Sequence, residues 1–193
     1  DWMYQKDDFV YENGKLVTVT SKDGYTINKL KDSNAPTQGK LQTSSNFRFG
    51  PGDVKFKDLN GDGVINNGSQ LIDDHGDLTV IGNTTPRYEY SFRLGMEYKG
   101  IDFSVFFQGV GKRAMWGSSP LSIPGFNSSD GAMPQAIAGD FWYETLDGSG
   151  NVIASNYDAF YPRAYNLGAS STGNNMQVCD KYLLNMAYLR MKN

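Results

Sequence analysis

The chain has 193 residues, of which 39% are hydrophobic and 13% aromatic, with 22 glycines and 7 prolines, a composition that indicates an all-β protein rich in turns. The net charge of −3 and the scattered Lys and Arg residues leave no basic patch, so we expect no nucleic-acid partner. The single cysteine, Cys179, has no partner for an internal disulfide, and no apolar run approaches the ~18 residues of a transmembrane helix.

Residues 1–30 contain short strand-like runs separated by turn signals. Residues 15–20 form the clearest run, and Asn13-Gly14 and Asp23-Gly24 are the turns. Residues 31–86 are instead dense in Asn, Asp, Gly and Pro. They predict a long ordered loop, and loops of this length commonly carry function.

This loop contains the first half of an EF-hand-type calcium loop. Asp58, Asn60 and Asp62 occupy positions 1, 3 and 5, Gly63 allows the sharp turn at position 6, and Val64 offers a carbonyl. Ile65 is expected to anchor the loop in apolar packing. The pattern predicts a calcium site.

The second half of the calcium pattern is incomplete. Position 12 is Ser69 instead of a bidentate carboxylate, and Asn66 stands at position 9. Asp73, Asp74 or Asp77 would have to supply the missing oxygen. The alternative is an Asx and glycine turn that needs no ion.

Residues 87–110 carry the strongest signal in the chain. From Tyr88 to Tyr98 every even position is apolar or aromatic, and after Lys99-Gly100 the alternation resumes at Ile101. A two-residue loop places Tyr98 opposite Ile101 and Phe92 opposite Phe107, so the apolar residues share one face. The opposite face pairs Glu97 with Asp102, Ser91 with Gln108 and Arg93 with Phe106.

Each arm of this hairpin is about as long as the roughly 9 to 11 tilted residues that cross a bilayer. A membrane β-barrel and a half-solvated sheet of a soluble sandwich share the period of two, so the pattern alone leaves both open. The loop that follows the hairpin favours the barrel, because outer-membrane barrels alternate short periplasmic turns with long extracellular loops.

Residues 111–180 predict that second long loop, with a short helix over 133–143 in which Ala136, Ile137, Phe141 and Trp142 share a face. Residues 181–193 predict the start of a further strand. A hairpin with flanking pieces does not close a barrel, so we expect a fragment.

The loops carry aromatic residues among Asn, Asp and Ser, a mixture suited to binding sugars. Trp116, Trp142 and Tyr143 are the candidate substrate-binding residues, and packing of the loop on its own side chains is the alternative. No catalytic residue is assigned. The only histidine, His75, lies in an acidic loop, no serine elbow is present, and Asp73 and Asp74 are adjacent in sequence, so the chain is not expected to be an enzyme.

Four segments resemble the C-terminal half of SusC/RagA-type TonB-dependent receptors of Gram-negative outer membranes. They also agree with that family in order and spacing, and Tyr161-Pro162-Arg163 resembles a further element of the family. The segments are residues 51–63, 79–88, 103–111 and 188–193. The family runs from the aspartate-glycine loop through an aspartate into the Thr79 segment. Residues 66–76 therefore look like an insertion and Asp77 takes the place of that aspartate, which makes it the preferred fifth calcium ligand.

The resemblance implies a large barrel with an N-terminal plug that imports oligosaccharides or peptides. TonB would act through an N-terminal region that these residues do not contain, and a SusD-like surface lipoprotein would cap the barrel. Within this scheme residues 1–30 are a barrel strand or loop, 31–86 and 111–180 are extracellular loops, 87–110 are a transmembrane hairpin and 181–193 begin another strand. Even positions from 88 to 98 would face outer-membrane lipid and odd positions the lumen.

Two other classes of protein remain as alternatives. A secreted soluble β-module that binds calcium and glycan would fold as a monomer without detergent. A glycan hydrolase would depend on carboxylates in the loops.

Overall fold

The computed structural model describes residues 2–42, 47–117, 135, 138–164 and 177–192. Over these residues the protein is all-β, as predicted. Among the described residues every sheet is antiparallel, the sheets do not close into a barrel, and the only helical segments are the 3-10 turns Lys6–Asp8, Gly39–Leu41 and Asp180–Tyr182. In the part of the chain that the structure describes, no helix has the length and apolar character to cross a membrane.

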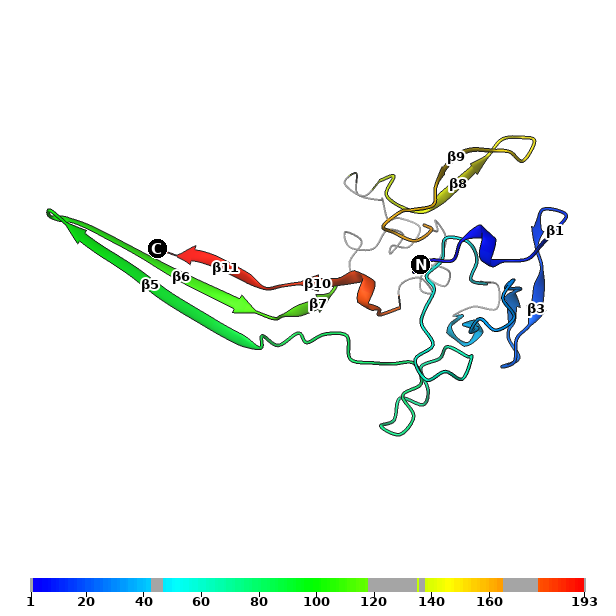
Figure 1. The fold of residues 1–193 in the computed structure, drawn as a ribbon, viewed down its shortest axis with the longest axis horizontal. Coiled ribbons are helices and arrows are strands. Elements are labelled where there is room, and N and C mark those ends of the chain that lie inside the picture. Colours follow the sequence, from blue (N-terminus) through cyan, green and yellow to red (C-terminus); the bar gives the residue numbers. More distant parts are fainter. Residues whose placement is uncertain (1, 43–46, 118–134, 136–137, 165–176, 193) are drawn as a thin grey trace. The chain divides into compact units, whose positions relative to one another are not determined.

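The chain separates into two compact units. The first unit comprises Asp1–Thr79 and Ser118–Gln177, and the second comprises Val80–Gly117 and Val178–Asn193. The described residues of the first unit contain the short strands β1 (Tyr11–Glu12), β2 (Lys15–Leu16), β3 (Thr18–Thr20), β4 (Thr26–Asn28), β8 (Tyr143–Leu146) and β9 (Val152–Asn156). The second unit contains β5 (Tyr88–Tyr98), β6 (Ile101–Gly111), β7 (Ala114–Trp116), β10 (Leu183–Asn185) and β11 (Tyr188–Lys192), as Figure 1 shows.

Both turns predicted in residues 1–30 are present. Asn13 and Gly14 have positive φ angles of 51° and 74° and join β1 to β2, with Glu12 opposite Lys15. Such angles at both central residues define the tight hairpin turn that Asn-Gly favours. The strands β1 to β4 are each only two or three residues long. Side chains from this region share a hydrophobic core with residues that come later in the chain.

The core of the first unit gathers aromatic side chains from its N-terminal end and from the long loop. The buried residues are Tyr4, Phe9, Leu41, Phe47, Phe49 and Ile65. Ile65 is 2% exposed, which confirms its predicted role as the apolar anchor of the calcium-like turn. Two buried amides tie the loop to this core, since Asn28 Nδ2 donates to the Phe49 carbonyl at 2.9 Å and Gln38 Nε2 to the Val54 carbonyl at 2.8 Å.

A second buried cluster joins the two sequence segments of the first unit. Trp142 packs with Met3 and Ala159, and Gly52 lies against the indole ring with φ +86°. The Arg163 amide donates to the Gly52 carbonyl at 2.7 Å, and Pro162 is fully buried. Residues 51–63 and Tyr161-Pro162-Arg163, two stretches that carry the family resemblance, therefore meet at Gly52.

The described end of the predicted helix over residues 133–143 is not helical. Residues 138–139 form a turn, Phe141 forms a β-bridge with Tyr161, and Tyr143 begins β8. Trp142 lies between two residues in extended pairing, so the tertiary pairing with Tyr161 outweighs the helical period there. Residues 133, 134, 136 and 137 lie outside the described residues.

The second unit is built on the three-stranded sheet β11-β6-β5, with β6 in the centre (Figure 1). The predicted register is confirmed at every position, from Tyr98 opposite Ile101 to Phe92 opposite Phe107. Lys99 and Gly100 have φ angles of 50° and 80°, which is the geometry of a two-residue hairpin turn.

Candidate functional site

One face of the β11-β6-β5 sheet is a continuous apolar surface. Because side chains alternate between faces, even positions of β5 share a face with odd positions of β6, and the β11 register adds Leu189 opposite Gly109 and Met191 opposite Phe107. We call this surface the apolar face. Its members are Tyr88, Tyr90, Phe92, Leu94, Met96, Tyr98, Ile101, Phe103, Val105, Phe107, Leu189 and Met191.

In the described residues most of the apolar face is exposed, although Val105 of the central strand β6 is only 8% exposed. Leu94 at the middle of β5 is 55% exposed and Met96 is 66% exposed, and every residue of β5 is exposed. Phe92 and Phe107 stack across the strands with ring centroids 4.8 Å apart. An uncovered apolar surface of this extent is what lipid or a large protein partner covers.

Two glycines of β6 lie directly beneath tyrosine rings of β5. A β-carbon at Gly109 would be 2.2 Å from Tyr90 Cζ, and one at Gly111 would be 2.0 Å from Tyr88 Cε2. Each tyrosine therefore lies flat over the backbone of its cross-strand partner. This arrangement gives the apolar face an aromatic end at the base of the long loops, and Tyr98 places another aromatic residue at the tight turn.

The opposite face is polar. Arg190 Nη2 donates to Gln108 Oε1 at 3.3 Å, and the Arg93 guanidinium lies 5.9 Å from the centre of the Phe106 ring. That cation–π contact covers Phe106, and the paired residues Val110 and Tyr188 also lie on this face, near the long loops. A sheet with one apolar and one polar face has the alternation of a strand between lipid and an aqueous lumen, and equally that of a strand between a core and solvent.

The strand length favours the membrane alternative. β5 and β6 each have 11 residues, and at ~3.4 Å per residue such a strand is about 34 Å long. Tilted by ~40°, it spans about 26 Å, close to the ~25 Å apolar band of a membrane barrel. Strands of soluble sheets are usually about half as long.

A bulge interrupts the sheet where the long loops begin. Val110 pairs with Tyr188 and Ala114 with Asn185, so residues 111–113 face only residues 186–187. Lys112 sits in this bulge with φ +47°. The extra residue redirects the chain, and β7 and β10 continue the pairing beyond it.

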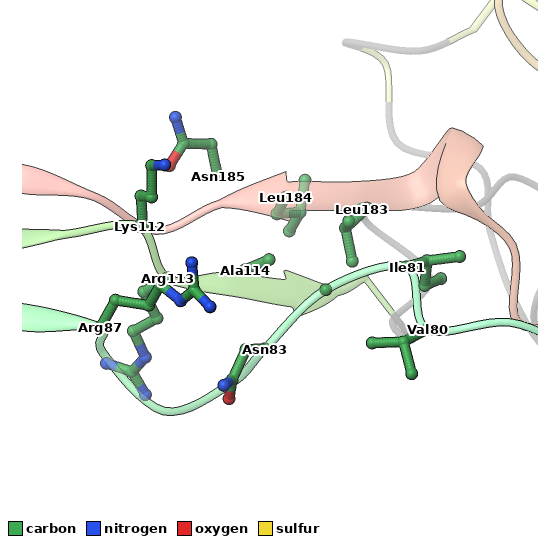
Figure 2. A pocket seen from close by; sticks show the side chains of 11 residues that line it. Val80, Ile81, Asn83, Arg87, Lys112, Arg113, Ala114, Leu183, Leu184 and Asn185 are labelled. Atoms are coloured by element: carbon green, nitrogen blue, oxygen red, sulfur yellow. The ribbon is translucent and has the colours of Figure 1, made fainter.

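A cavity of about 530 Å³ lies beside this bulge, entirely within the second unit. Figure 2 shows Arg87, Lys112 and Arg113 at one end of it and Val80 and Ile81 at the other. Segment 80–83 is held against β7 because the Ala114 amide donates to the Asn83 carbonyl at 2.9 Å, and Gly82 contacts Ala114 and Leu183 closely. Nothing in the sequence pattern marks this cavity, because it depends on a bulge at a non-glycine residue.

The calcium-like turn is stabilised by its own hydrogen bonds. Asp58 Oδ1 accepts the Gly61 amide at 2.6 Å and its Oδ2 accepts the Gly63 amide at 2.9 Å. Asn60 Oδ1 accepts the Asp62 amide, and Asp62 Oδ1 accepts the Val64 amide. These are the bonds of consecutive Asx turns.

The Asp77 carboxylate is hydrogen-bonded to this turn, at the position that the family resemblance implies. Its Oδ1 accepts the Leu59 amide at 2.7 Å and its Oδ2 accepts the Asn66 amide at 2.7 Å, so it links both ends of the turn. The Val64 carbonyl accepts a bond from Asn66 Nδ2. In the described residues no three His, Cys, Asp or Glu side chains come together closely enough to hold a metal ion. The geometry is that of a hydrogen-bonded turn, and calcium binding stays a prediction.

The three candidate substrate-binding aromatics are divided between the two units. Trp116 belongs to β7 of the second unit, whereas Trp142 and Tyr143 belong to the first. Trp142 is 6% exposed and its indole Nε1 donates to Gln5 Oε1 at 3.3 Å. Trp142 therefore fits the alternative in which loop aromatics pack on one another, while Tyr143 is half-buried in β8. Sugar binding by these residues stays a prediction.

Sequence comparison finds a partial relative. The chain is 36% identical over 59 residues to TonB-dependent receptor P26 of Formosa agariphila, a match that covers 31% of this chain and 5% of that protein. No family model and no solved structure matches the chain. The chain thus spans a small part of the length of this relative, and its similarity is to a TonB-dependent receptor.

Proposed function

We propose that this chain supplies barrel strands and extracellular loops to a SusC-like TonB-dependent transporter of the outer membrane. The transporter would import oligosaccharides or peptides and act without catalysis. TonB would reach it through an N-terminal region outside these residues, and a SusD-like lipoprotein would cover its loops.

The apolar face carries this proposal. Two 11-residue strands, with Tyr88 and Tyr98 at the two ends of β5, match the thickness and the interfacial belts of a bilayer. In a soluble module the same face would lie in water, with Leu94 and Met96 more than half exposed. The partial similarity to a TonB-dependent receptor supports the same class.

The outer strands of the sheet support it as well. In the described residues, β5 and β11 pair on one side only, with β6. Unpaired backbone groups are not tolerated in hydrocarbon, so neighbouring barrel strands would have to pair with both. Those strands would come from the rest of the transporter.

The proposal is tested by placing one charge on either face of the same strand in the full-length protein. Leu94→Arg lies near the middle of the membrane on the apolar face and should cost about 2–4 kcal/mol in barrel stability, whereas Ser91→Arg faces the lumen. We expect Leu94→Arg to abolish accumulation of heat-modifiable protein in the outer membrane and Ser91→Arg to accumulate normally. Equal accumulation of the two variants contradicts the proposal.

A further inference from the structure

The cavity beside the Lys112 bulge combines a cationic end with an apolar wall. Arg87, Lys112 and Arg113 line one end, and Val80, Ile81 and Leu183 are among the residues of the wall. In the part of the chain covered by the structure, none of these three cations forms an ion pair with a carboxylate. Three like charges around one cavity repel one another, and an anion bound there would remove that cost.

The fold places these three cations, and a hydrogen bond to the backbone holds the side chain of Arg113. Arg113 Nε donates to the Thr84 carbonyl at 3.0 Å. This bond uses one donor of the guanidinium, and the terminal nitrogens can then donate to a ligand. Lys112 is held by the bulge, with φ +47°. Arg87 directly precedes β5.

The cavity adjoins a second cavity at the aromatic end of the sheet. This second cavity, of about 580 Å³, is lined by Tyr88 and Tyr90 and shares Lys112 and Asn185 with the first. The two tyrosines are the aromatic end of the apolar face at the base of the long loops. A ligand in the cationic cavity would therefore lie next to the tyrosine end of the apolar face.

We propose that this cavity binds the phosphate headgroup of an outer-leaflet lipid, an inference that rests on the proposed membrane location. If the apolar face lies in hydrocarbon, the residues just beyond Tyr88 lie at the height of the headgroups. Arginine and lysine bind phosphate through charge-assisted hydrogen bonds, and basic pockets at this depth bind anionic headgroups. The apolar wall favours a lipid over free phosphate, because it would contact the glycerol and the start of the acyl chains.

The test measures lipid retained by the full-length protein in detergent, by native mass spectrometry after addition of phosphatidylglycerol or phosphatidylcholine. One variant carries Arg87→Gln, Lys112→Gln and Arg113→Gln. The matched control carries Arg93→Gln, Arg190→Gln and Lys192→Gln, which removes the same charge from the polar face of the same sheet. Since each basic residue contributes roughly fivefold to anionic lipid binding, we expect the first variant to lose phosphatidylglycerol at least ~10-fold and the control to retain it.

Each other outcome overturns the proposal in a defined way. Equal loss in the control variant shows that general charge, and not this cavity, retains the lipid. Displacement of the lipid by millimolar inorganic phosphate assigns the cavity to a soluble anion. If the triple variant does not assemble, the single variants Arg87→Gln and Lys112→Gln are measured, and unchanged retention in both contradicts the proposal. A wild-type protein that never reaches the outer membrane refutes the proposed function instead, whereas one that reaches it without retaining lipid refutes only this site.

Discussion

Gly52 lies in contact with the indole ring of Trp142, so close that a β-carbon at Gly52 would be 2.5 Å from the ring atoms Cδ2 and Cε3. The same β-carbon would be 2.9 Å from Cβ of Arg163. The Gly52 amide also donates to the Tyr4 carbonyl at 2.8 Å, and the Gly52 carbonyl accepts the Arg163 amide at 2.7 Å. This one residue therefore joins the N-terminal segment, the long loop and residues 141–163 of the first unit.

Gly52→Ala should open this junction. The methyl group clashes with a buried indole and also strains a backbone at φ +86°. We expect amide hydrogen exchange to accelerate at least ~10-fold at Tyr4 and Trp142, measured by mass spectrometry on the full-length protein. Gly24→Ala is the control, because Gly24 has φ +83° and nothing within 4 Å of the added carbon. Similar effects in both variants would mean that the indole contact contributes little.

Asp77→Ala should loosen the calcium-like turn. The carboxylate accepts two short backbone bonds that link Leu59 to Asn66, and loss of bonds to a partly buried charged group costs about 1–2 kcal/mol. Exchange at the amides of residues 59–66 should rise, whereas Asp73→Ala at an exposed position should leave it unchanged.

The same exchange experiment tests the calcium prediction. Calcium bound at Asp58, Asn60, Asp62, Val64 and Asp77 would slow exchange in residues 58–66 relative to a chelator, and the difference would vanish in Asp77→Ala. Identical exchange with calcium and with chelator would assign the turn to hydrogen bonding alone.

Glu144 should make the first unit sensitive to acid. Its Oε1 accepts a bond from Lys6 Nζ at 2.8 Å and its Oε2 one from the Tyr157 hydroxyl, and these bonds, that of Lys6 first, lower the pKa of Glu144. A carboxylate with a lowered pKa stabilises the fold above its unfolded pKa, near ~4.3, and loses that contribution as the pH falls through the folded pKa. Glu144→Gln should therefore increase exchange around residues 143–157 at pH 7, and this difference should disappear once the pH has fallen below the lowered pKa of Glu144.

The exposed pair Lys31–Asp7 provides the comparison for this experiment. Its nitrogen and oxygen are 3.6 Å apart and both side chains lie in solvent, so Lys31→Met should change exchange little at either pH. An effect of Glu144→Gln that persists in acid would show that the glutamate acts by shape and not by charge.

The Lys99-Gly100 turn offers a stabilising substitution. Lys99 adopts φ +50°, a conformation that asparagine adopts at lower cost. Lys99→Asn should raise the midpoint of urea unfolding of the full-length protein in lipid vesicles, whereas Gly100→Val, at φ +80°, should lower it. A lower midpoint for Lys99→Asn would indicate that the lysine contributes through its position 5.2 Å over the Tyr98 ring.

The hairpin was predictable in full because its information is local. A strict period of two and a two-residue turn determine each cross-strand pair, starting with Tyr98 opposite Ile101 at the turn. No contact with a distant part of the chain is needed. The family resemblance likewise directed attention to Asp77, which the structure brings against Leu59. Local pattern thus accounted for the apolar face and for the turn.

The extended conformation of Trp142 and the cavity beside Lys112 were not predictable in the same way. Trp142 is extended because it meets Gly52 and the Tyr161 carbonyl, and neither contact is visible in the helical period of its own segment. The cavity beside Lys112 depends on a bulge whose residue carries no turn signal. Both features come from contacts between residues far apart in sequence, which composition and periodicity do not encode.

The connections within the β11-β6-β5 sheet differ in what their closure costs. β5 and β6 are joined by Lys99-Gly100 alone, so they meet with little loss of chain entropy, whereas β11 reaches β6 only after residues 112–187 have looped back. Loop-closure entropy grows with the logarithm of length and amounts to roughly 2–4 kcal/mol for a loop of this size. The hairpin should accordingly form early in assembly, with the strand at Tyr188–Lys192 adding to a template already present.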